Sequence, residues 1–156
     1  MNSQIQTLKA EIAADRQAIA EIYATLNRYP EALASEEQLI AVAYNLHNLY
    51  CAFESIFQHV AEVFENQITD RAGWHAEVLH RMTLGIEGIR PALLSPAAYD
   101  ALDELRRFRH LFRSAYRLRL DPERLALVRR KARALEQVYR ADMGRFLAFL
   151  DSLLQD

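Results

Sequence analysis

Apolar residues recur at mixed steps of three and four along most of the chain, which is the spacing of one buried face of an α-helix. The first such segment covers 3–28 and ends before Pro30, because the residue preceding a proline disfavours the helical conformation. The second covers 35–66 and begins at Ser35-Glu36-Glu37-Gln38, a capping box in which the serine and glutamine side chains satisfy backbone N–H groups. It carries the longest run of apolar residues, so we expect it to be the central helix.

Three more helices are predicted in the second half of the chain. One covers 72–84, and the glycines and the proline after it predict an irregular connection. The others begin at Ser95-Pro96 and Asp121-Pro122, since a capping side chain followed by proline is typical of a helix start. Helices joined by such short connections predict an all-α fold, an antiparallel bundle of four or five helices that forms a single domain over 1–156.

The composition excludes two classes of protein. Hydrophobic residues make up 51% of the chain and charged residues 26%, which is neither a disordered nor a membrane composition. No stretch approaches the roughly 18 apolar residues of a membrane helix, and the amino-terminal segment lacks the pattern of a signal peptide. The single cysteine, Cys51, has no partner for an internal disulfide, which suits a reducing compartment. The sequence therefore predicts a cytoplasmic protein.

The net charge of −2 is unevenly distributed along the chain. Residues 1–100 carry 6 Lys/Arg against 13 Asp/Glu, whereas residues 101–133 carry 11 against 4 and have a net charge of +7. A basic segment of this kind is typical of a surface that binds a polyanion such as RNA. The alternative is a solvated arginine-rich face that pairs with the acidic half of the chain, within one molecule or across a dimer.

The basic segment contains a helix with regularly spaced arginines. At about 100° per residue, one flank of this helix carries Arg106, Arg109, Arg113 and Arg117, with Tyr116 nearly in line with Arg109. Guanidinium groups stay charged and bind phosphate through paired hydrogen bonds, and they can stabilise charge that develops on a phosphate during cleavage. We expect RNA to contact Arg106, Arg113, Arg117 and His110.

The segment RRFRHLFRSAY, followed by RLRLDPERL, resembles the conserved segment of the HepT-like branch of HEPN proteins. The resemblance continues through AYNLHNLYCAFESIFQHVAEVFENQITD and WHAEVLHRMTLGIEGIRPALLS and covers roughly residues 35–125. Members of this branch are toxins that cleave RNA without a metal ion and are paired with a minimal nucleotidyltransferase antitoxin. The resemblance implies a HEPN-like homodimer, with RNA and such an antitoxin as partners and no cofactor.

The motif of this branch is an arginine, four residues, a histidine, one residue and a tyrosine. Aligned without gaps, Arg109 takes the arginine place, Ser114 the histidine place and Tyr116 the tyrosine place. The resemblance implies that these three are the catalytic positions, with the histidine and arginine acting together in cleavage. It also implies that the antitoxin neutralises the toxin by transferring AMP to Tyr116.

Ser114 is a departure from the family motif. A serine has no titratable proton near neutral pH and cannot replace a histidine, whose pKa is about 6.5. The chain is then a natural member without nuclease activity, or a toxin disarmed by substitution, or a protein in which His110 takes the role one turn earlier. The spacing disfavours His110, because only three residues separate it from Arg106. We therefore expect impaired RNA cleavage, and the alternative function is a non-catalytic HEPN-like module for RNA binding or assembly.

Helix geometry separates the motif positions as well. Residues five apart on a regular helix point about 140° apart, so Arg109 and Ser114 do not converge within one helix. A distorted helix end would bring them together, and so would a two-fold dimer whose subunits share one groove. We expect the dimer.

Other polar residues interrupt the predicted helices. Three of them belong to the predicted third helix, namely Trp74, His75 and His80. They either extend the site or cover the edge of the bundle. Three others belong to the central helix, namely Asn45, His47 and Asn48. They either line a cleft or make buried hydrogen bonds. Glu77 and His80 form a single Glu-x-x-His, whereas a di-iron bundle uses two, so we expect no metal site.

Overall fold

The fold is a bundle of long helices with two shorter helices laid across one side. The computed structural model describes residues 1–65, 72–114 and 119–155. In these residues the helices are α1 (Asn2–Leu26), α2 (Glu36–Phe64), α3 (Trp74–Arg81), α4 (Pro96–Ser114) and α5 (Pro122–Leu153). Among them there is no strand, and Ile86 and Arg90 make one isolated bridge. The prediction of an all-α bundle is confirmed.

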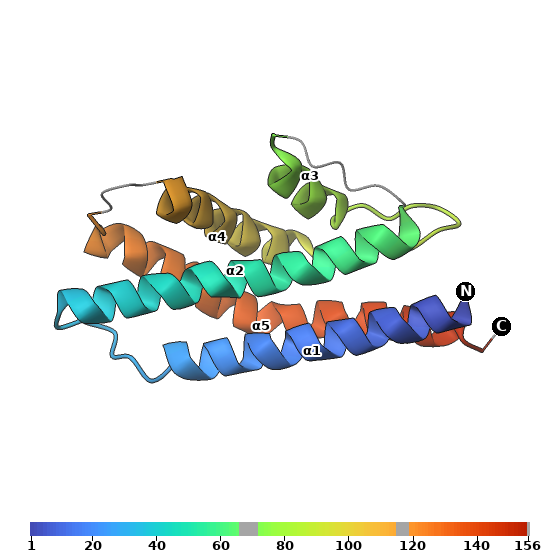
Figure 1. Cartoon of the computed structure of the whole chain (residues 1–156), viewed down its shortest axis with the longest axis horizontal. Helices are drawn as coiled ribbons and strands as arrows, with labels where there is room; N and C mark the ends of the chain where they lie inside the picture. Colours follow the sequence, from blue (N-terminus) through green and yellow to red (C-terminus); the bar gives the residue numbers. More distant parts are fainter. Residues whose placement is uncertain (66–71, 115–118, 156) are drawn as a thin grey trace.

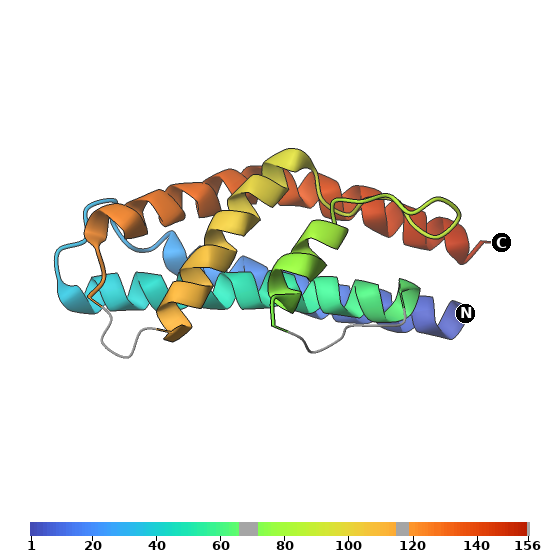
Figure 2. The same ribbon diagram turned by 90° about the horizontal axis from the view of Figure 1, so that it is seen from above.

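The three long helices lie alongside one another, and α1 runs in the direction opposite to α2 and α5 (Figure 1). Both ends of the chain therefore lie at one end of the bundle. α4 crosses α2 and α5 obliquely, and α3 lies on the same side against α2 and α4 (Figure 2). No helix in the described part of the chain is long and apolar enough to cross a membrane.

The central position predicted for α2 is confirmed, because α2 contacts each of the other four helices. Its side chains fill the middle of the core on every turn, and the fully buried ones include Leu46, Leu49, Tyr50, Phe53 and Phe57. Burying a large apolar side chain stabilises a fold by about 1.5–3 kcal/mol. This helix therefore supplies much of the stability and forms the floor on which α3 and α4 rest.

The predicted helix starts are also confirmed. The Ser35 hydroxyl accepts the Gln38 N–H at 3.2 Å, while the Gln38 side chain accepts the N–H of Ala34 instead of that of the serine. Ser95 caps α4 through the Ala98 N–H, and the buried Asp142 carboxylate of α5 holds Ser95 by its N–H and its hydroxyl. This contact holds the first turn of α4 against α5.

α3 is shorter than predicted, because it ends at Arg81 instead of near residue 84. The carbonyl of Met82 accepts the N–H groups of Leu93 and Leu94, which belong to the returning chain. The N–H of Ile86, which would continue the helix, donates to Arg90. The irregular connection therefore makes hydrogen bonds with the backbone groups that a longer helix would need for its own.

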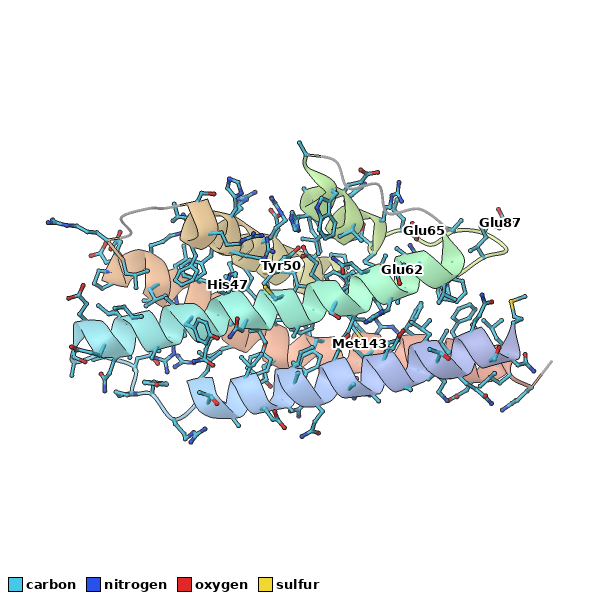
Figure 3. The ribbon with its side chains drawn as sticks, viewed as in Figure 1. His47, Tyr50, Glu62, Glu65, Glu87 and Met143 are labelled. Carbon is cyan, nitrogen blue, oxygen red and sulfur yellow. The ribbon has the colours of Figure 1, made fainter. Side chains whose placement is uncertain are left out.

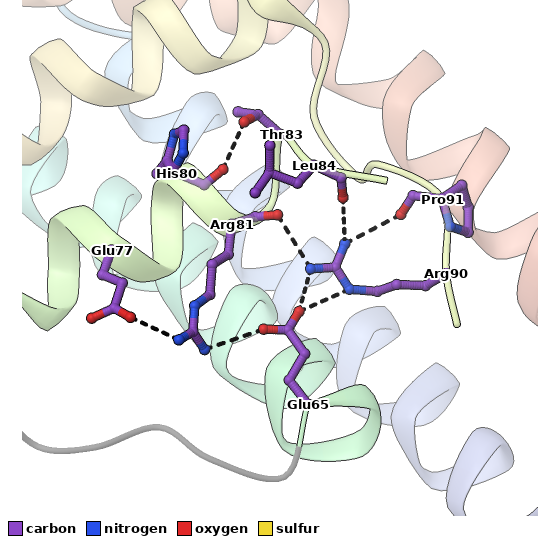
Figure 4. Close-up of polar contacts among 8 residues, drawn as sticks. All are labelled: Glu65, Glu77, His80, Arg81, Thr83, Leu84, Arg90 and Pro91. Atoms are coloured by element: carbon purple, nitrogen blue, oxygen red, sulfur yellow. Dashed lines mark hydrogen bonds and ion pairs between the residues drawn. The ribbon is translucent and has the colours of Figure 1, made fainter. Parts of the chain in front are cut away.

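The connection after α3 is held by a buried arginine (Figure 4). The Arg90 side chain is fully buried and donates to the Glu65 carboxylate at the end of α2 and to the carbonyls of Arg81 and Leu84. Arg81 of α3 also donates to Glu65, at 3.3 Å. The Glu65 carboxylate, whose side chain is 10% exposed, thus ties α3 and its connection to the end of α2.

We expect Arg90→Met to lower the free energy of unfolding by about 3–5 kcal/mol, because it leaves the largely buried Glu65 carboxylate without its main partner. Chemical denaturation measures this difference. Arg107→Met is the matched control, since the Arg107 side chain is 55% exposed and its ion pairs lie at the surface. It should cost less than about 1 kcal/mol. Equal effects of the two substitutions would contradict a structural role for the buried network.

Candidate nucleic-acid interface

α4 presents two kinds of arginine. Its apolar side packs into the core through Leu105 and Phe108. On the flank beside this apolar side, Arg106 pairs with Asp103 at 3.0 Å, and Arg107 pairs with Asp103 at 2.8 Å. Arg107 also pairs with Glu104 at 3.4 Å, so the carboxylates of Asp103 and Glu104 balance the charges of these two arginines.

Arg109 and Arg113 differ from them, because neither pairs with a carboxylate anywhere in residues 1–65, 72–114 and 119–155. Arg109 is half-buried, and its Nε donates to the Cys51 Sγ of α2 at 3.3 Å. Arg113 is exposed one turn further along the helix. The last turns of α4 thus carry two guanidinium groups whose positive charge is not neutralised within the described structure.

His47 of α2 lies beside this pair of arginines, where α4 crosses α2 (Figure 3). Its ring packs on Phe112 at a centroid distance of 5.2 Å, and its Nε2 lies 3.8 Å from the Cys51 Sγ. Burial lowers the pKa of His47, and the positive charges of Arg109 and Arg113 lower it further. The neutral imidazole is therefore favoured next to the two cations, because a protonated ring would be repelled by them.

A second polar cluster lies further along α2. The Glu54 carboxylate is buried and contacts His75 Nδ1 of α3 at 2.7 Å. The hydroxyl of Tyr50 is buried near the same carboxylate but makes no hydrogen bond of normal geometry among the described residues. Burial and the charge of Glu54 raise the pKa of Tyr50, and the positive charges of Arg106 and Arg109 oppose this rise. The pKa of Tyr50 therefore depends on both the Glu54 carboxylate and the arginines of α4.

The motif positions are not brought together within α4. The helix remains regular through its last residue, Ser114, so a distorted helix end does not turn Ser114 towards Arg109. Ser114 and His110 are both exposed, whereas Arg109 faces α2. Tyr116 and Arg117 lie outside the described residues.

The other residues proposed from the sequence differ in their burial and in their contacts. Asn45 donates to the carbonyl of Ala41 on its own helix, and Asn48 is half-buried. Trp74 covers His75 at a ring distance of 3.9 Å, whereas His80 is exposed. Glu77 pairs with Arg81, and the described residues hold no group of three or more side chains suited to a metal ion.

Neither Glu54 nor the hydroxyl of Tyr50 was predicted from the sequence to belong to the site. A signal for Glu54 was present, since it lies four residues after Tyr50 and three before Phe57, on the spacing of the buried face. A carboxylate at such a position requires a buried partner. Its partner could not be identified, because His75 comes from a different helix.

A family model described as HepT-like protein matches residues 41–150, which is well over half of the chain. The chain therefore belongs to the HepT-like family, as the resemblance of its basic segment predicted. The matched region includes α3 and α4 and most of α2 and α5, and thus both polar clusters. No curated protein and no solved structure matches the chain.

Proposed function

We propose that this protein binds RNA along the last turns of α4. The observation that carries this proposal is the pair Arg109 and Arg113, which are the α4 arginines without a carboxylate partner in the described structure. Guanidinium groups bind phosphate oxygens in pairs of hydrogen bonds and remain charged at every accessible pH. The contact with Cys51 holds Arg109 against α2, so less side-chain entropy is lost when it binds a phosphate.

Membership of the HepT-like family supports the proposal that the protein is the toxin of a toxin–antitoxin pair, from the metal-independent RNA-cleaving class. The partner would be a minimal nucleotidyltransferase that acts in the same cytoplasm and transfers AMP to Tyr116. The protein would act as a homodimer whose two α4 helices border one groove. A dimer suits the monomer geometry, because Arg109 faces α2 while Ser114 is exposed on another side of α4.

Cleavage at the motif position would be impaired by Ser114, which cannot accept and return a proton as a histidine does. His110 is a weak substitute, since it is exposed and none of the described residues orients its ring. This exposure also favours the second candidate function, a non-catalytic HEPN-like module that binds RNA or assembles with partners.

Ser114→His should raise RNA cleavage by about 10²–10⁴-fold, because positioned proton transfer contributes about that factor. Single-turnover cleavage of a labelled RNA measures the change. The gain should require Arg109, so Ser114→His combined with Arg109→Ala should lose it, and added chelator should have no effect. Rapid cleavage by the unaltered chain that His110→Ala abolishes would instead make His110 the acid–base group.

Incubation with ATP, magnesium and the cognate nucleotidyltransferase should add the mass of AMP at Tyr116. The added phosphate would pair with the guanidinium groups of α4 and exclude RNA from them. Peptide mass spectrometry locates the modification, and Tyr116→Phe should abolish it, whereas Tyr44→Phe, at an exposed tyrosine of α2, should not. Modification at another residue would contradict the proposed toxin–antitoxin mechanism.

A further inference from the structure

The Glu54–His75 pair joins α2 to α3 near the arginines of α4. Glu54 is 4% exposed, although it carries a carboxylate, and the ring of His75 is its hydrogen-bond partner at 2.7 Å. A carboxylate can only accept a hydrogen bond, so Nδ1 of His75 carries the hydrogen of this contact. In the neutral ring, Nε2 then has a lone pair that can accept a proton.

The surroundings of His75 fix its orientation but leave it accessible. Its side chain is 29% exposed, against 5% for the side chain of Glu54. The Trp74 ring packs on it at a centroid distance of 3.9 Å. A histidine that is oriented by a buried carboxylate and open on its other side is the arrangement that general acid–base catalysis uses.

Tyr50 connects this pair to the proposed RNA surface. The charges of Glu54, Arg106 and Arg109 all act on its hydroxyl. Cys51, which accepts from Arg109, and Glu54, which binds His75, are three residues apart on α2 and so share one face of it. Tyr50 and Glu54 are one turn apart on α2, and α3 and α4 lie next to each other on one side of that helix (Figure 2). The base and the phosphate-binding arginines therefore belong to neighbouring helices above one short stretch of α2.

We propose that His75, oriented by Glu54, is the proton-transfer group for the slow RNA cleavage that this chain retains in the absence of the motif histidine. The inference rests on the proposed function, since it requires RNA bound at Arg109. His75 would touch the reacting 2′-hydroxyl and be a catalytic residue, whereas Glu54 acts through it and is a positioning residue.

The step is a transesterification that needs no further reactant. Nε2 of His75 takes the proton of a 2′-hydroxyl, and the 2′-oxygen forms a bond to the adjacent phosphorus. The bond from phosphorus to the 5′-oxygen breaks, and that oxygen takes a proton from water while His75 releases its own to solvent. The products are a 2′,3′-cyclic phosphate and a 5′-hydroxyl, and the arginines stabilise the charge on the phosphate oxygens.

The test is single-turnover cleavage of a labelled RNA with excess protein and long incubation. The unaltered chain should cleave slowly, and His75→Ala should reduce the rate by about 10²-fold or more. Added imidazole should restore part of the rate to His75→Ala, because it supplies the missing base. A purely structural histidine would not produce this rescue. His80→Ala is the matched control, an exposed histidine on the same helix, and should leave the rate unchanged.

Two further measurements separate catalysis from folding. His75→Gln can still donate to Glu54, so it should keep the melting temperature of the unaltered chain while losing cleavage. Every variant should retain RNA affinity within about threefold. If RNA binds and Ser114→His is active, but His75→Ala cleaves like the unaltered chain or the unaltered chain does not cleave at all, this inference alone is wrong. If RNA does not bind, the proposed function fails together with it.

Discussion

The packing of α4 across α2 determines which arginines of the basic segment remain available to a ligand. Because Leu105 and Phe108 are buried in the core, the rotation of α4 about its axis is fixed. That rotation brings Arg109 onto Cys51, whereas Arg106 and Arg107 pair with Asp103 through their spacing along α4 itself. The position of Arg109 is therefore a consequence of core packing, and the packed core holds the proposed RNA surface in place.

Two carboxylates of α2 hold the other side of this surface. Glu54 binds His75 near the start of α3, and Glu65 binds Arg81 at its end together with Arg90 in the connection that follows. A short helix such as α3 has little stability of its own, so these contacts define where it lies. Buried charge here has a cost in desolvation that only well-placed partners offset, which makes the position of His75 specific.

The sequence was sufficient to predict the helices and their order, because periodicity and capping residues are local signals. It located the starts of α2, α4 and α5, and it failed at the end of α3, where distant backbone groups of Leu93 and Leu94 compete for a carbonyl. Motif resemblance identified the family and selected Arg109. The contacts of Arg109 with Cys51 and of His75 with Glu54 could not be predicted, since each joins two helices whose relative rotation depends on the whole core.

The salt dependence of RNA affinity tests the proposed surface most directly. Each phosphate neutralised on a single strand contributes about 0.7 to the slope of log affinity against log salt. Arg113→Ala should flatten that slope by about this amount. Arg140→Ala should leave it unchanged, because Arg140 lines a depression between α1 and α5, away from α4. Binding by the unaltered chain that does not depend on salt, or equal slopes for the two variants, would contradict the account.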